Sequence, residues 1–127
     1  MITGSKLVLT LGKYLYKHID SAFKYKQSGN MYDVYFYVYY QLPRLNQDWT
    51  KSDEYNDIHE MTLNLNITTY SNKLRFNVIQ VSESEETIGQ YIIPIDKLQD
   101  IRAAHQIVLE KLKKLLNNKF ADYEFVF

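Results

Sequence analysis

The sequence predicts a single α+β domain in which two helices pack on one face of a four-stranded antiparallel sheet. Three observations carry this prediction. A helical period runs near each end of the chain, an aromatic and β-branched run lies between them, and two alternating segments are joined by a two-residue turn. At 127 residues, the chain suits one domain over residues 1–127 and can bury a core without the help of disulfides or structural metal ions.

Residues 5–27 carry the first helical period. Apolar side chains recur there at three- and four-residue spacing, and Gly12 beside them would let a neighbouring element approach closely. Gly29 can end this helix in a left-handed conformation. A short strand over residues 7–11 is the competing interpretation. The apolar positions are Val8, Leu11, Leu15, Ile19 and Ala22.

Residues 31–42 are almost continuously aromatic or β-branched, which favours a strand. Successive side chains of a strand point to opposite faces, and both faces here are apolar enough to need cover. One face matches a core, whereas the other consists of tyrosines, whose hydroxyls can stay in water. The first face holds Val34, Phe36, Val38 and Tyr40, and the second holds Tyr35, Tyr37 and Tyr39.

The segment over residues 44–57 is polar and too long for a tight hairpin. Long loops in compact domains often carry function. This one contains Trp49, the only tryptophan, which would either anchor the loop to the core or act as a binding hot spot. A long loop after the aromatic strand also makes that strand a candidate for the sheet edge.

Residues 58–70 and 73–81 alternate between apolar and polar side chains and predict a hairpin. Residues 71–72 supply a two-residue turn, because Asn tolerates positive φ. A one-residue slip would destroy the match of the two apolar faces. The predicted pairs are Ile67–Phe76, Leu65–Val78 and Thr69–Leu74 on the apolar face, and Asn66–Asn77 and Thr68–Arg75 on the polar face.

The remaining elements are a fourth strand, a second helix and a short C-terminal strand. Residues 87–95 predict the strand, in one of two registers: the first buries Tyr91 and Ile93, and the second buries Ile88 and Ile92. The helix is expected to begin at a capping box made by Asp96 and Gln99, and residues 121–127 alternate as a last strand. The apolar stripe of the helix is Leu98, Ile101, His105, Val108, Leu112 and Leu115.

A candidate binding surface arises if the tyrosine face of the aromatic strand lies beside the polar face of the hairpin. Tyr and Arg supply many hot spots of protein interfaces, and aromatic rings also stack on single-stranded bases. The alternative is a solvated face whose tyrosines are half covered by residues 44–57. The candidate partner-binding residues are Tyr35, Tyr37, Tyr39, Trp49, Asn64, Asn66, Arg75 and Asn77.

The sequence contains few residue patterns that are typical of catalytic sites. It has no cysteine, its four glycines are isolated, and no Gly-x-Ser-x-Gly elbow is present. His18, His59 and His105 are scattered without metal-ligand spacing, so packed histidines are expected in place of a metal site. We therefore expect no enzyme, no catalytic residue, no metal and no cofactor.

Charge and hydropathy limit the classes of partner that this chain is expected to bind. Lys and Arg number 15 and Asp and Glu number 15, so the zero net charge makes nucleic-acid binding the weaker expectation. No apolar run is long enough to span a bilayer, and the N-terminal stretch is too polar for a signal peptide. Together with the absence of cysteine, this predicts a cytoplasmic protein that has no membrane partner.

The predicted order of elements resembles that of RWD-type domains and of the small RNA-binding subunits of the signal recognition particle. The resemblance implies an interaction fold. RWD-type domains typically carry a Tyr-Pro motif, which this chain lacks, and the particle's subunits are strongly basic, unlike this neutral chain.

Three functions follow as expectations. The first is a non-enzymatic protein-interaction module (an adaptor, assembly factor or small inhibitor) whose partner is another protein or a second copy in a homodimer. The second is single-stranded nucleic-acid binding through the tyrosine face. The third is a small enzyme with a histidine-centred site. Clustering of Arg44, Lys51, Lys73 and Arg75 beside the tyrosines would favour the second.

Overall fold

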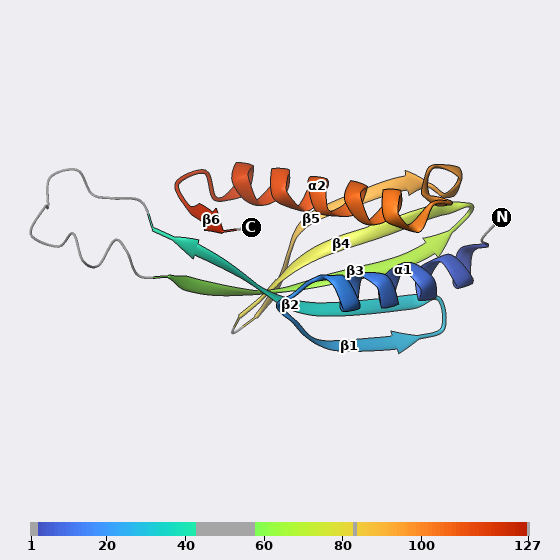
Figure 1. The fold of residues 1–127 in the computed structure, drawn as a ribbon, viewed down its shortest axis with the longest axis horizontal. Coiled ribbons are helices and arrows are strands. Elements are labelled where there is room, and N and C mark those ends of the chain that lie inside the picture. The colour runs from blue at the N-terminus through green and yellow to red at the C-terminus, as the bar shows by residue number, and fades with distance from the viewer. Residues whose placement is uncertain (1–2, 43–57, 83, 127) are drawn as a thin grey trace, which may run out of the picture.

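The computed structural model describes residues 3–42, 58–82 and 84–126, which form an α+β fold with a six-stranded antiparallel sheet (Figure 1). No helix within these residues is long and apolar enough to cross a membrane. The elements are α1 (Gly4–His18), β1 (Ala22–Ser28), β2 (Met31–Gln41), β3 (His59–Tyr70), β4 (Lys73–Val81), β5 (Glu85–Pro94), the short 3-10 helix η2 (Ile95–Leu98), α2 (Ile101–Lys119) and β6 (Glu124–Val126).

The sheet is a five-stranded meander with one added strand. Strands β1 to β5 lie in chain order, each antiparallel to the next, and β6 pairs with β2 beyond the end of β1. The predicted α+β class, antiparallel sheet and C-terminal strand are confirmed. The predicted four-stranded layout is wrong, because a further strand precedes the aromatic one.

That further strand replaces the second half of the predicted first helix. The helix ends at His18, and β1 then pairs with β2 through a two-residue turn at residues 29–30. Gly29 does adopt positive φ, at 58°, but it serves this turn and caps no helix. The strand is favoured because its aromatic and lysine residues alternate over residues 23–26.

Strand β2 is consequently an interior strand, contrary to its prediction as a sheet edge. It has β3 on one side and both β1 and β6 on the other. Its face assignment is confirmed: Val34, Phe36 and Val38 are buried, and the tyrosines between them lie on the opposite face.

The hairpin of β3 and β4 has the predicted register at all five pairs. Ser71 and Asn72 both adopt positive φ, as a two-residue hairpin turn requires. The next strand, β5, carries a bulge opposite Val78 and Ile79. Because the bulge shifts the register, Ile88 and Ile93 are both buried, and each of the two proposed registers holds for one half of the strand.

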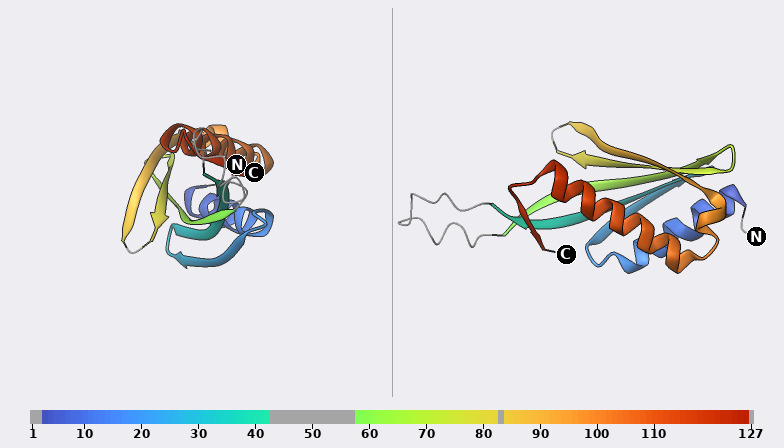
Figure 2. Two further views of the ribbon diagram at one scale, coloured as in Figure 1. Left: turned by 90° about the vertical axis from the view of Figure 1, so that its left-hand side faces the viewer. Right: turned by 90° about the horizontal axis from the view of Figure 1, so that it is seen from above.

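The two helices lie on the same side of the sheet, but α1 lies closer to the strands than α2 does. The sheet curls around α1, which contacts β1, β2, β3 and β4, whereas α2 packs across α1 (Figure 2). Two glycines permit the close approaches. An ideal Cβ on Gly12 would lie 2.3 Å from Tyr32 Cγ, and one on Gly89 would lie 2.5 Å from a methyl group of Leu115.

The start of the second helix differs from its prediction. Residues Ile95–Leu98 form a 3-10 turn, and α2 begins after Asp100, whose Oδ1 accepts hydrogen bonds from the N–H groups of Arg102 (3.0 Å) and Ala103 (3.3 Å). The N-cap is therefore Asp100 in place of Asp96. Of the predicted stripe, Leu98, His105, Val108 and Leu112 are buried.

Candidate functional site

The outer face of the sheet is the candidate site, because neither helix covers it (Figure 2). Four rings gather on its β1–β2 side: Phe23, Tyr35, Tyr37 and Tyr39, here called the aromatic strip. Phe23 reaches it because the register of β1 shifts between Ala22 and Lys24, so Phe23 has no cross-strand partner in β2.

Three rings of the aromatic strip are linked by ring contacts, which Phe23 makes with Tyr35 and Tyr37. The rings of Phe23 and Tyr37 stack with centroids 4.5 Å apart, and the Tyr35 ring lies 6.4 Å from that of Phe23. Phe23 is 44% exposed and Tyr39 is 38% exposed, while Tyr35 and Tyr37 are half-buried. The strip therefore presents a preformed ring surface, whose side chains lose little freedom on binding.

Charges of both signs flank the aromatic strip. The ammonium groups of Lys24 and Lys26 lie 5.3 Å and 5.7 Å from the centroid of the Tyr35 ring, in cation–π geometry. Asp33 is the cross-strand partner of Lys26, and Glu60 is that of Tyr39. Among the residues that the structure describes, the charges around the aromatic strip are therefore of both signs.

A hydrogen-bonded polar cluster fixes the neighbouring part of the outer face. Oδ1 of Asp33 accepts hydrogen bonds from the side-chain amides of Asn66 (2.8 Å) and Asn64 (3.2 Å). The Asn77 amide donates in turn to Asn66 Oδ1 at 3.4 Å. Asn64 is only 4% exposed, so its amide stabilises the sheet internally.

The structure brings together some of the predicted binding residues. Tyr35, Tyr37 and Tyr39 lie together, with Asn64 directly opposite Tyr35. Farther along the face, the Arg75 guanidinium lies over the Tyr70 ring at 5.3 Å and so is engaged away from the strip. Trp49, Arg44 and Lys51 lie outside the described residues.

Sequence reasoning missed three members of this surface: Phe23, Lys24 and Lys26. The apolar spacing that Ile19 and Ala22 extend places all three in the predicted first helix. The alternation Phe-Lys-Tyr-Lys over residues 23–26 is typical of a strand and places Lys24 and Lys26 on one face, but Phe23 joins them there only through the register shift between Ala22 and Lys24.

The three histidines lie at two places. The His18 and His105 rings are 6.0 Å apart at the contact of α1 with α2, and the Tyr14 ring packs against both. His59 instead stacks on Tyr40. Within residues 3–42, 58–82 and 84–126, no group of three or more His, Asp or Glu side chains is arranged to hold a metal ion.

His105 is the most buried of the three histidines. It is 8% exposed, and its buried Nε2 has no hydrogen-bond partner in the described part of the chain. Burial, and then the nearby charge of His18, lower the pKa of His105. His18 has its Nδ1 2.9 Å from the carbonyl oxygen of Tyr14, and a carbonyl can only accept, so Nδ1 donates.

Comparison of the chain with protein families, curated proteins and solved structures finds no match. The resemblance to RWD-type domains and to the signal recognition particle subunits rested on a four-stranded order, which the additional strand β1 changes. The case for a function therefore rests on the residues of the surface themselves.

Proposed function

We propose that this protein is a non-enzymatic interaction module that binds another polypeptide through the aromatic strip. The observation that carries the proposal is the stack of Phe23 on Tyr37, with Tyr35 beside it, on a sheet face that neither α1 nor α2 covers. Exposed aromatic groups held on rigid strands are typical of interface hot spots. An adaptor, an assembly factor and a small inhibitor all fit this mode of action.

The mixed charge around the strip supports a polypeptide partner. Lys24 and Lys26 would attract acidic side chains, and Asp33 and Glu60 would attract basic ones. A phosphate backbone would meet those two carboxylates unfavourably. The partner can be a different protein or a second copy of this chain, and the absence of cysteine suits a cytoplasmic setting.

Single-stranded nucleic acid is the second candidate. It is favoured by the two ammonium groups over the Tyr35 ring, since bases stack on aromatic rings while lysines neutralise phosphates. It is disfavoured by the zero net charge of the chain. The two candidates differ in their salt dependence and in the probe that each would bind.

The test uses a double variant of the two most exposed rings, Phe23→Ser with Tyr39→Ser, because both changes should leave the core intact. The matched control is Ile92→Ser, an exposed apolar residue on the distant β5 side of the same face. Affinity capture from the native host, sedimentation of the free protein and titration with labelled oligo-dT are measured on all three forms.

The expected result is one polypeptide, or self-association, that wild type and Ile92→Ser retain and the double variant loses. Each protein should melt cooperatively, which separates loss of binding from loss of fold. Oligo-dT binding that the double variant loses would establish the nucleic-acid candidate instead. A partner retained equally by all three proteins would refute the role of the aromatic strip.

A further inference from the structure

Strand β1 forms one edge of the sheet (Figure 1). It pairs with β2 on one side, and within residues 3–42, 58–82 and 84–126 no strand pairs with its other side. The residues from Phe23 to Ser28 are all exposed. An open edge of this kind offers main-chain hydrogen bonds to a further strand, and many proteins bind an extended peptide in this way.

The register of the β1–β2 pair identifies which main-chain groups face outward. In an antiparallel pair, every second residue is hydrogen-bonded to the partner strand, and the residues between direct their N–H and C=O groups to the other side. The turn at residues 29–30 makes Ser28 and Met31 the hydrogen-bonded pair that closes the hairpin. Farther back along β1, Gln27 and Tyr25 lie between bonded residues, so their main-chain groups face the free edge.

The side chains of β1 give the two sides of this edge different chemistry. Lys24 and Lys26 point to the outer face of the sheet, where both ammonium groups lie over the ring of Tyr35. Tyr25 points to the helix side, where its ring stacks on that of Tyr32 with centroids 5.6 Å apart and stays 52% exposed. A strand added beside β1 would therefore meet two cations on one face and an exposed aromatic ring on the other.

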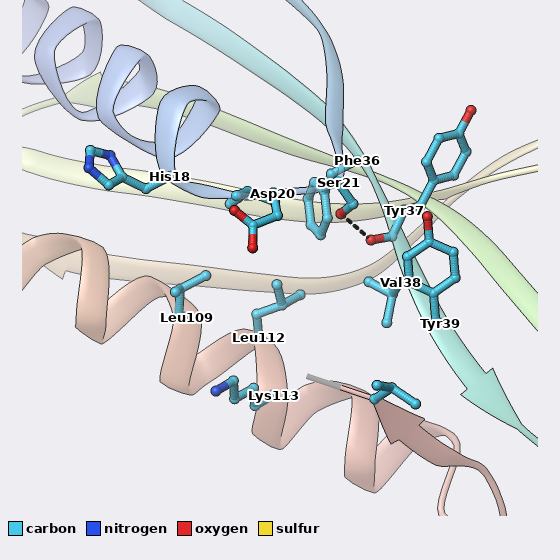
Figure 3. Close-up of a pocket in the computed structure, with 12 residues that line it drawn as sticks. His18, Asp20, Ser21, Phe36, Tyr37, Val38, Tyr39, Leu109, Leu112 and Lys113 are labelled. Atoms are coloured by element: carbon cyan, nitrogen blue, oxygen red, sulfur yellow. Dashed lines mark hydrogen bonds between the residues drawn. The ribbon is translucent and has the colours of Figure 1, made fainter. Parts of the chain in front are cut away.

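Two acidic residues lie close to β1, and both point away from its free edge. Asp33, opposite Lys26, directs its Oδ1 to Asn64 and Asn66 of β3. Asp20 precedes β1 and lines a pocket of about 400 Å³, where its carboxylate points toward α2 (Figure 3). The other walls of this pocket come from the middle of β2, the second half of α2, and β6. Among the described residues, the two lysines therefore set the charge of the outer side of this edge.

We propose that the free edge of β1 pairs with an extended segment of a partner protein in which Asp or Glu alternates with apolar residues. The proposal rests on the proposed function in one respect, namely that the partner is a polypeptide. The acidic side chains of the added strand would lie beside Lys24 and Lys26, and the apolar ones would cover the ring of Tyr25. Main-chain hydrogen bonds to Tyr25 and Gln27 would supply affinity, and the side chains would supply specificity.

A second copy of this chain fits the same edge poorly. β1 has the sequence Ala-Phe-Lys-Tyr-Lys-Gln-Ser and contains no acidic residue. Two β1 strands side by side would bring the lysines of both copies to one face, and like charges on neighbouring strands are destabilising. Lysines on an edge strand are also a common protection against self-pairing. The charge of the edge therefore favours an acidic partner over a second copy.

The test selects peptides from a random library of twelve-residue sequences, displayed on phage, that bind the immobilised wild-type protein. The enriched sequences should carry Asp or Glu at every second position over about five residues, with aromatic or β-branched residues between them. The strongest binder is then synthesised with blocked ends and titrated into the protein. At about ten times its Kd, exchange of the Tyr25 and Gln27 amide protons should slow about tenfold, because those N–H groups become hydrogen-bonded.

Variants assign the binding to the edge and to its lysines. Gln27→Pro removes an outward N–H at a position where an edge strand accepts proline, so it should abolish binding, whereas Gln27→Ala should retain it. Lys24→Gln with Lys26→Gln should weaken binding by roughly tenfold. The matched control, Lys73→Gln with Lys97→Gln at exposed lysines outside β1, should leave binding unchanged. If Gln27→Pro does not fold, the lysine variants and the exchange of the two amides decide the question.

Three outcomes would overturn the proposal. The first is that no peptide is enriched, or that the enriched peptides lack alternating acidic residues. The second is that the double lysine variant binds as tightly as wild type. The third is binding that a folded Gln27→Pro protein retains.

The double variant Phe23→Ser with Tyr39→Ser separates this proposal from the proposed function. Peptide binding that this variant loses and Gln27→Pro retains would place the peptide on the aromatic strip, so the proposed function would stand and the β1 edge would fail. Peptide binding that Gln27→Pro loses and the double variant retains would establish the edge and refute the role of the strip.

Discussion

Gly12 in α1 lies directly against the ring of Tyr32 in β2. A Cβ built on Gly12 would fall within 2.8 Å of three ring carbons, which is closer than real Cβ atoms come to a neighbour. Tyr32 is 1% exposed and also stacks on Tyr25, so its ring has no free direction in which to move. The missing side chain of Gly12 thus sets how closely the first helix approaches the sheet.

Gly12→Ala is therefore expected to destabilise the protein, although alanine is the better helix former. Overpacking a core typically costs about 1–3 kcal/mol, against a gain of up to about 1 kcal/mol in helix propensity. Urea unfolding should show the net loss. The double variant Gly12→Ala with Tyr32→Leu should lose less than the sum of its two single changes, and a Gly12→Ala protein as stable as wild type would contradict the packing described here.

The sequence contained enough information for the hairpin of β3 and β4 because its signals are local. Alternation marks both strands, and the turn at Ser71 and Asn72 fixes which residues face each other. The predicted closeness of Gly12 to its neighbour was also correct. In both cases the signal in the sequence is local, although the ring that Gly12 approaches belongs to Tyr32 on a different element.

The β1 strand and the pocket could not be predicted in the same way, since they depend on distant residues. Residues 22–28 become a strand because the edge of β2 offers hydrogen bonds, and that preference outweighs a helical spacing which Ile19 and Ala22 only extend by chance. The pocket is formed by four segments between residues 18 and 126, and none of them carries a local signal for it. The sequence predicts the outer tyrosines of the strip, whereas the place of Phe23 depends on the pairing of β1 with β2.

A pH dependence of stability should follow from His105. Because burial and the charge of His18 lower the pKa of His105 in the folded protein, the unfolded chain binds its proton more readily. The stabilisation is fully present above the unfolded pKa of about 6.5 and is lost as pH falls through the lower folded pKa. Urea unfolding at about pH 7.5 and about pH 5.5 should show wild type weakening in acid.

Two substitutions test whether His105 is responsible. His105→Leu and His105→Gln both remove the titrating group, one with an apolar and one with a polar side chain. The acid-induced loss of stability should shrink by the same amount in both, even though their stabilities at neutral pH differ. An unchanged loss in either variant would assign the pH dependence to other groups.

The last prediction concerns Asp33, whose Oδ1 accepts hydrogen bonds from both Asn64 and Asn66. Asp33→Ala removes that acceptor and leaves the buried Asn64 amide with only the Val34 carbonyl oxygen, at 3.5 Å. An unsatisfied buried donor costs about 1–3 kcal/mol, so urea unfolding should show a loss in this range. Asp33→Asn keeps an oxygen acceptor and should cost clearly less, while Asp96→Ala at an exposed site should stay within about 0.5 kcal/mol of wild type. Equal losses in the alanine and asparagine variants would mean that the charge of Asp33, and not its hydrogen bonds, stabilises this face of the sheet.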